Sequence, residues 1–238
     1  PMHYKAVLID IDDTLFDFRQ SSFEALVHAF AHWGYSFTQA DMPHYEVYND
    51  RLWCAFERGE VERDFIFTER FRLYFAERGI TGVDTSEFNE VYLHALAEGY
   101  AFMPHCHELI QALYGKYKIF VVTNGDTYAQ ESRIAKSGLA DYFDGVFISE
   151  QLGCKKPEKE FYDKVFAIIG EEYRTCSLMV GDSLTSDMQG GRNAGIPTCY
   201  YGKPENADER CDYVIEDLLQ LPDVLSGVQT PRAATLLS

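Results

Sequence analysis

Apolar side chains recur at helical spacing through most of the first hundred residues. Between residues 17 and 97 they fall three and four positions apart, and glycine or proline separates one such stripe from the next. The stripes are Phe23–Phe30, Tyr45–Phe56, Phe67–Phe75 and Phe88–Leu96. This pattern predicts four amphipathic helices, enough to form a small bundle with an aromatic core.

A different pattern begins near residue 100, where short apolar runs alternate with helical stretches. The runs are Ile119–Val122, Gly145–Ile148, Ser177–Val180, Pro197–Tyr200 and Tyr213–Ile215. Short runs separated by helices are typical of right-handed βαβ units, whose parallel sheet is covered on both faces. The run Lys5–Ile9 belongs with them, so the helical stretch is predicted to be inserted after the first strand.

The sequence therefore predicts an α/β fold, with a Rossmann-like parallel sheet core, helices on both of its faces and an inserted all-α cap of four helices. Residues 1–16 and 98–238 form the predicted core, and residues 17–97 form the predicted cap domain. The last ten residues, 229–238, contain a proline and small side chains and are expected to form a loose tail.

The charge balance narrows the partners that the protein can bind. The 238 residues include 38 acidic and 21 basic side chains, for a net charge of −17. This surplus disfavours nucleic-acid backbones and anionic membrane surfaces, so an anionic substrate would need a local cation, either a metal ion or a placed lysine. The six cysteines form no C-x-x-C pair, and we recognise neither a signal peptide nor a long apolar stretch. We therefore expect reduced thiols in a cytoplasmic protein with no nucleic-acid or membrane partner.

Polar side chains follow the predicted strands at the edge where open parallel sheets bind ligands. They are Asp10, Asp12 and Thr14 after the first strand, Thr123 and Asn124 after the second, Lys156 beyond the third, and Asp182 and Asp187 after the fourth. Asp10 and Asp12 are the most informative, because two nearby carboxylates repel unless a cation or a proton compensates them. Their pattern alone arises often by chance. Its coincidence with three other strand ends makes a common site the better interpretation.

This set of groups fits phosphoryl transfer. Asp10 would be the nucleophile that forms an aspartyl-phosphate, and Asp12 the general acid that protonates the leaving alkoxide and then activates water. Magnesium prefers hard oxygen ligands, which Asp10, Asp182 and a backbone carbonyl near Asp12 would supply. Asp187 is expected to support this metal shell rather than to bind the ion directly. The alternative for these aspartates is loop capping at strand ends, a frequent role for the residue.

Three further residues are predicted to bind the non-bridging oxygens of the phosphoryl group. They are the Thr123 hydroxyl, the backbone N–H of Asn124 and the Lys156 ammonium, whose hydrogen bonds and charge would stabilise the transition state. Thr123 and Asn124 could instead cap the next helix, and the two roles are compatible because a helix N-terminus itself attracts phosphate. Lys156 could also be an ordinary surface lysine at the start of a helix.

These motifs resemble, in order and spacing, the four motifs of the haloacid dehalogenase superfamily. They are Asp10-x-Asp12-x-Thr14, Thr123-Asn124-Gly125, Lys156-Pro157 and Gly181-Asp182-x4-Asp187. The inserted helices look like the cap of its first subclass. Lys156 is preferred to Lys155 because the matching lysine of the family directly precedes the proline. Asp13 departs from a common pattern, since many relatives have glycine at this position.

Within the superfamily the chain is similar to the pyrimidine 5′-nucleotidase branch. The similar segments are residues 12–16, residues 181–187 with Gly190-Gly191, the pattern from Asn49 to Gly59, and Arg70-Phe71. The resemblance implies magnesium-dependent dephosphorylation of nucleoside monophosphates, including noncanonical pyrimidines, as a clearing function. The implied partner is thus a small phosphorylated metabolite.

The predicted cap contains candidate residues for contacts to the leaving group. Phe18 and Arg19 come just after the first motif, where a cap would meet the active site, and either could touch the substrate. Asn49, Trp53 and Phe56 share one helix face at i, i+4 and i+7, and a nucleobase could stack there. An aromatic stripe at this spacing is more often part of a core, so both interpretations remain.

Other functions share parts of this pattern. A phosphatase of another small metabolite, such as phosphoglycolate, a sugar phosphate or N-acylneuraminate 9-phosphate, would use the same residues. A 2-haloacid dehalogenase needs the nucleophile but neither Asp12 nor a metal ion, so Asp12 together with Asp182 argues against it. A phosphomutase would keep the phosphate on its substrate, and a catalytically silent binding protein would have no need of the complete set.

Overall fold

The computed structural model of the protein describes residues 4–232, which form two compact units. The α/β unit contains residues 4–17, 102–127 and 137–232, and the helical unit contains residues 18–101 and 128–136. Most of the predicted tail, residues 233–238, lies outside the described residues.

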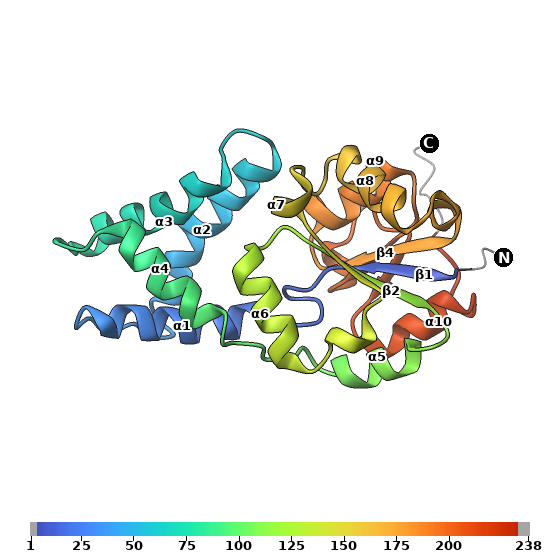
Figure 1. Cartoon of the computed structure of the whole chain (residues 1–238), viewed down its shortest axis with the longest axis horizontal. Coiled ribbons are helices and arrows are strands. Elements are labelled where there is room, and N and C mark those ends of the chain that lie inside the picture. The colour runs from blue at the N-terminus through green and yellow to red at the C-terminus, as the bar shows by residue number, and fades with distance from the viewer. Residues whose placement is uncertain (1–3, 233–238) are drawn as a thin grey trace. The chain divides into compact units, whose positions relative to one another are not determined.

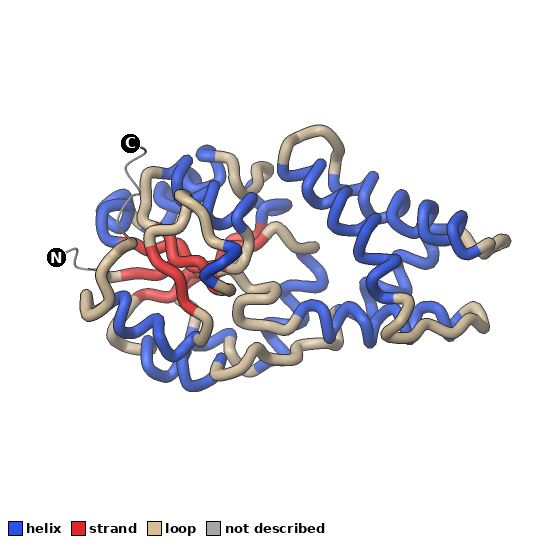
Figure 2. The backbone as a smooth tube through the Cα atoms, turned by 180° about the vertical axis from the view of Figure 1, so that it is seen from behind, coloured by secondary structure: helices blue, strands red, loops and turns tan. Residues whose placement is uncertain are grey.

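The α/β unit is built on one parallel sheet of six strands, in the order β3-β2-β1-β4-β5-β6. The strands are β1 (Ala6–Ile9), β2 (Lys118–Thr123), β3 (Gly145–Ile148), β4 (Ser177–Gly181), β5 (Thr198–Tyr201) and β6 (Tyr213–Ile215). All six predicted strands are therefore confirmed. Figure 2 shows them gathered as one layer of strands among the helices of this unit. Every residue of the central strand β1 is buried, as expected for a parallel sheet covered on both faces.

Short helices lie between the strands of this unit and after the last of them. They are α5 (Cys106–Leu113), α7 (Ser149–Leu152), α8 (Lys159–Ile169), α9 (Gln189–Ala194) and α10 (Leu221–Leu225), with single turns at Ala140–Tyr142, Glu171–Cys176, Leu184–Met188, Pro204–Asn206 and Leu218–Gln220. Helix α8 buries Phe161, Val165 and Phe166 in one hydrophobic cluster with Leu8 and Met179 of the sheet. Burying each such side chain contributes about 1.5–3 kcal/mol, so this contact fixes the helix on the sheet face.

The helical unit contains the predicted four-helix insertion. Its helices are α1 (Phe18–His32), α2 (Met42–Glu57), α3 (Arg63–Arg78) and α4 (Thr85–Leu96), labelled in Figure 1. Their core is aromatic: the Phe88 ring lies 4.8 Å from that of Phe30 and 4.7 Å from that of Phe71, centroid to centroid. Asp84 precedes helix α4 and caps it, because its side chain accepts the backbone N–H groups of Ser86 and Glu87.

A fifth helix joins this unit from a distant part of the sequence. Helix α6 (Thr127–Ser137) follows β2, and its residues 128–136 pack with the helical unit. Ala129 lies in the aromatic core, the Ser132 hydroxyl donates to the Ala97 carbonyl at 2.9 Å, and Arg133 Nε donates to the Gly99 carbonyl at 2.7 Å. The helical unit is therefore assembled from two separate segments of the chain.

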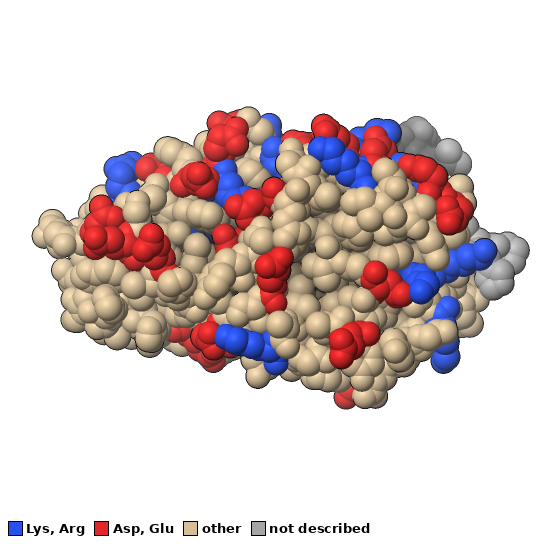
Figure 3. All heavy atoms as spheres, in the orientation of Figure 1, with Lys and Arg blue, Asp and Glu red and all other residues tan. Residues whose placement is uncertain are grey.

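Acidic side chains are common on the surface (Figure 3), as the negative net charge predicts. On the face drawn in Figure 3, acidic side chains are spread over the surface and basic ones lie among them. All six cysteines are free thiols, and four of them are buried. Every helix within residues 4–232 is too short or too polar to cross a membrane.

Candidate active site

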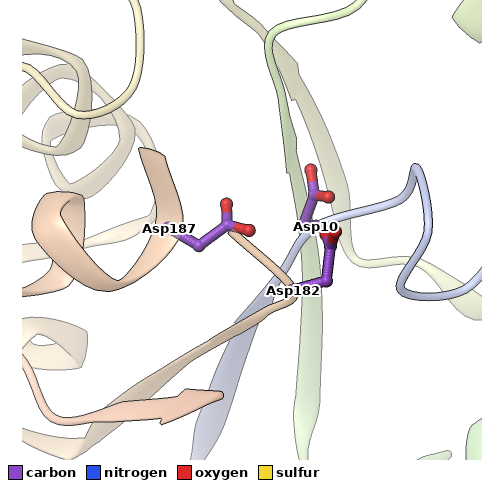
Figure 4. A group of neighbouring side chains, drawn as sticks. All are labelled: Asp10, Asp182 and Asp187. Atoms are coloured by element: carbon purple, nitrogen blue, oxygen red, sulfur yellow. The ribbon is translucent and has the colours of Figure 1, made fainter. Parts of the chain in front are cut away.

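The register of the sheet brings two aspartates together at its carboxyl edge. Ile9 pairs with Val180 of β4, and the Asp10 backbone N–H continues the ladder by donating to the Val180 carbonyl at 2.9 Å. Asp10 and Asp182 therefore follow the ends of neighbouring strands. Carboxylate oxygens of Asp10, Asp182 and Asp187 all lie within 4.8 Å of one another. Figure 4 shows the three side chains converging on one space.

Lys156 supplies the positive charge of this cluster. Its ammonium donates to Asp10 Oδ1 and Asp187 Oδ1, both at 2.7 Å, and to the Val122 carbonyl at 3.0 Å. All three donors of the ammonium thus have acceptors, which a side chain only 2% exposed requires. The neighbouring Lys155 instead pairs with Glu158 at 2.7 Å, outside the cluster.

The cluster holds more negative charge than one ammonium can balance. Burial raises the pKa of Asp10 to about 8, and the charges of Asp187 and Asp12 add to this, while Lys156 opposes it. Burial, followed by the charges of Asp10 and Asp187, also raises the pKa of Asp182 well above its usual range. Burial alone would lower the pKa of Lys156, but the two carboxylates that it contacts outweigh this and raise it. Hard carboxylate oxygens with uncompensated charge fit a divalent cation such as Mg²⁺.

Asp187 reaches the cluster because its surroundings leave room for it. It lies in the π-helical turn Leu184–Met188, and its Oδ2 accepts the backbone N–H of Ser183 at 3.1 Å. A Cβ atom on Gly181 would lie only 2.1 Å from Asp187 Oδ2. Glycine at the end of β4 is therefore needed for this side chain to approach Lys156.

The segment after β1 turns sharply back on itself. Asp12 is half-buried and forms an isolated bridge with Phe16, while Asp13 has a left-handed backbone with φ of 58°. Glycine adopts this conformation most easily and aspartate tolerates it, so Asp13 can occupy this turn. Thr14 is buried and donates its hydroxyl to Asp182 Oδ1 at 3.2 Å.

The end of β2 and the loop that follows it contain the other predicted phosphate ligands. Thr123 is 1% exposed, and its hydroxyl accepts the backbone N–H of Gly125 at 3.1 Å. The Asn124 side chain bonds to the backbone of Lys156 through both its oxygen and its nitrogen. Helix α6 starts beyond this loop, where Thr127 donates its N–H and its hydroxyl to Glu150 at 3.1 and 2.5 Å. The structure thus places both predicted residues beside the lysine loop.

The residues predicted to contact the substrate all lie in the helical unit. Asn49 is buried, and its Oδ1 accepts from Arg70 at 3.2 Å and from the Tyr45 hydroxyl at 3.3 Å. The half-buried Trp53 ring lies 5.6 Å from that of Phe56, which is itself part of a small hydrophobic cluster. Phe56 is thus a core residue, whereas Trp53 remains half-buried.

The two remaining candidates lie at the start of α1. Arg19 pairs with Glu46 at 2.7 Å, and the Phe18 ring lies 5.6 Å from the Arg133 guanidinium carbon. That Phe18, Arg19, Asn49 and Trp53 contact a substrate stays a prediction.

Fold and site together define an α/β protein in which three aspartates and one lysine cluster at the carboxyl edge of a parallel sheet. Residues 4–195 match the model of the haloacid dehalogenase-like hydrolases. The chain belongs to this family, so the predicted superfamily resemblance is confirmed.

Characterised relatives include two pyrimidine 5′-nucleotidases. YjjG of Escherichia coli is 36% identical over 199 residues, which cover 84% of this chain and 86% of that protein. PynA of Streptococcus pneumoniae is 37% identical over 201 residues, which cover 84% of each. Among solved structures, the haloacid dehalogenase-like hydrolase YfnB of Bacillus subtilis bound to magnesium is 32% identical, with a TM-score of 0.88 over 94% of this chain and 99% of that one.

Proposed function

We propose that the protein is a magnesium-dependent phosphomonoester hydrolase that removes phosphate from pyrimidine nucleoside monophosphates, including noncanonical ones. The observation that carries this proposal is the cluster of Asp10, Lys156, Asp182 and Asp187 at the carboxyl edge of the sheet. The cluster combines a carboxylate nucleophile with the positive charge of Lys156, which reduces the repulsion between that carboxylate and an approaching phosphate dianion.

The reaction proceeds in two displacements at phosphorus. Asp10 attacks, its oxygen forms a bond to phosphorus, and the bond to the leaving alkoxide breaks while Asp12 protonates that oxygen. Asp12, now a carboxylate, takes a proton from water as the water oxygen attacks the phosphorus of the aspartyl-phosphate. Inorganic phosphate leaves, and Asp10 and Asp12 return to their starting states. Lys156, Thr123 and the backbone N–H of Asn124 hold the non-bridging oxygens of the phosphoryl group.

Asp10, Asp182 and a backbone carbonyl near Asp12 would hold Mg²⁺, with Asp187 orienting the shell. When bound, the ion supplies positive charge that offsets the repulsion between the carboxylate and the phosphate. The buried acids support this role, since burial and mutual repulsion raise the pKa of Asp10 and Asp182 and a cation would restore their charged forms. The magnesium in the YfnB relative is consistent with it.

The substrate class rests on the two nucleotidase relatives and on the cap residues. Phe18, Arg19, Asn49 and Trp53 are the proposed contacts to the nucleoside, with Trp53 the stacking surface for the base. Asp12 disfavours haloacid dehalogenation, because that reaction has no alkoxide leaving group to protonate. A phosphatase of phosphoglycolate, a sugar phosphate or N-acylneuraminate 9-phosphate is the second candidate, since it would use the same catalytic residues.

A phosphate-release panel tests the proposal. UMP, dUMP and TMP are compared with phosphoglycolate, sugar phosphates and N-acylneuraminate 9-phosphate, each with magnesium and with EDTA. Nucleotides should be preferred, EDTA should abolish release, and Asp10→Asn should remove essentially all activity while the protein stays folded. A clear preference outside nucleotides would overturn the substrate class, and wild-type activity of Asp10→Asn would overturn the mechanism.

The stacking role of Trp53 can be tested separately. Trp53→Leu should raise KM for UMP while leaving KM for p-nitrophenyl phosphate, which carries no nucleobase, nearly unchanged. Trp33→Leu is the matched control, because Trp33 packs on Phe88 at 5.2 Å in the core of the helical unit. Equal effects of the two substitutions on both substrates would indicate that Trp53 only stabilises the fold.

A further inference from the structure

The Asn124 side chain makes a pair of hydrogen bonds that the reaction scheme does not use. Its Nδ2 donates to the Lys156 carbonyl at 2.9 Å, and its Oδ1 accepts the Lys156 backbone N–H at 3.0 Å. The two residues are separated by 32 positions in the chain. One side chain thus satisfies both backbone polar groups of the lysine.

Lys156 depends on such support because its backbone lies in a loop. It falls between α7 and α8, outside the strands and helices whose ladders would hold it. The carboxamide makes the two bonds that a neighbouring strand would make, and together they fix both the position and the orientation of one peptide segment. A neutral side chain that is a hydrogen-bond donor and acceptor at adjacent atoms is required for this pair.

The position of this backbone decides where the ammonium goes. The lysine side chain has four rotatable bonds, so ordering it costs rotamer entropy. Its three acceptors, Asp10, Asp187 and the Val122 carbonyl, are fixed on the sheet and in the turn after β4. A small shift of the backbone would therefore break contacts that the buried ammonium cannot replace with water.

We propose that the Asn124 carboxamide is a positioning residue that sets the Lys156 ammonium between Asp10 and Asp187, and through it the binding of the phosphate group. This role differs from that of the Asn124 backbone N–H, which the proposed function assigns to the phosphate itself. The inference rests on the proposed function for its effect on catalysis. Its effect on the place of Lys156 follows from the hydrogen bonds alone.

The first measurement follows Lys156 without any turnover. Amine acylation followed by mass spectrometry reports which lysines are accessible, and the buried Lys156 of the wild-type protein should resist it. Asn124→Leu keeps a similar volume but loses both hydrogen bonds, so Lys156 should become at least several-fold more reactive. Thermal unfolding of the same samples identifies labelling that comes from general unfolding.

The matched control is another asparagine that bonds to the same loop. Asn193 Nδ2 donates to the Pro157 carbonyl at 2.8 Å, one residue beyond the lysine. Asn193→Leu removes a hydrogen bond from the loop but none from Lys156. Lys156 should therefore stay protected in this variant. Equal labelling in Asn124→Leu and Asn193→Leu would mean that any loosening of the loop exposes the lysine, and the proposal would be wrong.

The second measurement uses catalysis and phosphate binding. Asn124→Leu should lower kcat/KM for UMP by about 10–100-fold, in the range seen when groups that orient a reactive residue are removed. Inhibition by orthophosphate should weaken by a similar factor. The magnesium concentration for half-maximal activity should not rise, because moving the ammonium away leaves more uncompensated negative charge on Asp10 and Asp187, whereas a generally disordered site would raise this concentration.

The outcomes separate the two proposals. If the wild-type enzyme releases no phosphate from nucleotides, the proposed function fails, and the labelling of Lys156 still tests the positioning role. If it does release phosphate and Asn124→Leu keeps both wild-type kcat/KM and a protected Lys156, the function stands and the positioning role is refuted.

Discussion

Thr14 donates its hydroxyl to Asp182 Oδ1 at 3.2 Å, across 168 positions of the chain. The threonine of the first motif thus orients the aspartate that follows the fourth strand, and this bond also acts to lower the pKa of that carboxyl group. Thr14 is fully buried, so its hydroxyl must find its hydrogen-bond partner within the protein.

Thr14→Val keeps the shape of the side chain and removes this bond. A hydrogen bond of this kind contributes about 1 kcal/mol, so the magnesium concentration for half-maximal phosphate release should rise by about fivefold. A magnesium titration of activity measures the shift. Thr175→Val is the control, since Thr175 is exposed and bonds only to the local Glu172 carbonyl at 3.3 Å. Equal magnesium dependence in the two variants would contradict the orienting role.

Gly181→Ala should displace Asp187. The added Cβ would lie 2.1 Å from Asp187 Oδ2, closer than atoms can approach, so the carboxylate must move away from Lys156. Overpacking of this kind costs about 1–3 kcal/mol of stability. We expect a lower melting temperature and an activity loss of at least about tenfold, of the size found when supporting groups of a metal site are removed. An alanine variant with wild-type activity would show that Asp187 need not hold its place.

Asp41 should make the stability of the helical unit depend on pH. Partial burial acts to raise its pKa, but hydrogen bonds from the Thr38 hydroxyl and N–H, both at 2.8 Å, and the Arg78 guanidinium outweigh this and lower it. A lowered folded pKa gives stability that is present above the unfolded pKa of about 3.9 and is lost as the pH falls through the folded value.

Asp41→Asn should therefore be less stable than the wild type by about 1 kcal/mol at pH 7. The difference should shrink steadily below about pH 4, where the wild-type carboxylate gains its proton. Denaturant unfolding followed by helical circular dichroism at several pH values measures both. A difference that stays constant down to pH 2 would rule out the titration of Asp41 as its cause.

The cysteines should differ in reactivity according to their burial. Burial raises the pKa of Cys106 to about 12 and that of Cys199 still further, so both remain thiols at pH 8. Cys176 is half-buried near the surface of the α/β unit. Alkylation of the native protein, read by mass spectrometry, should modify Cys176 well before Cys106 or Cys199. Simultaneous modification of all three would indicate unfolding rather than local access.

The elements of the fold were predictable because each has its own period in the sequence. Continuous apolar runs predicted the buried parallel strands to within one or two residues, as at Ile119–Val122 for β2. Glycine and proline separate the helices of the insertion. The carboxyl edge of a parallel sheet then gathered Asp10, Asp182 and Lys156 without any knowledge of their distances.

The support of the site was not predictable in the same way. The bonds from Thr14 to Asp182 and from Asn124 to Lys156 join residues far apart in the chain, and no local pattern specifies which polar side chain will meet which loop. The left-handed backbone at Asp13 is likewise set by the turn that brings Phe16 back to Asp12 and has no periodic signal in the sequence. The sequence of helix α6 indicates that one of its faces is buried, but it does not indicate which unit that face packs against.

The two-segment construction of the helical unit has a consequence for exchanging substrate specificity between relatives. A graft of residues 18–101 alone would leave behind Ala129 of the aromatic core and the donors from Ser132 and Arg133 to the carbonyls of Ala97 and Gly99. The transplanted helices would then expose an apolar surface, and the carbonyls of Ala97 and Gly99 would lose their hydrogen-bond donors. A chimaera that transfers residues 128–136 together with the insertion should fold, so the helical unit is encoded by two separate stretches of the gene that must be inherited together.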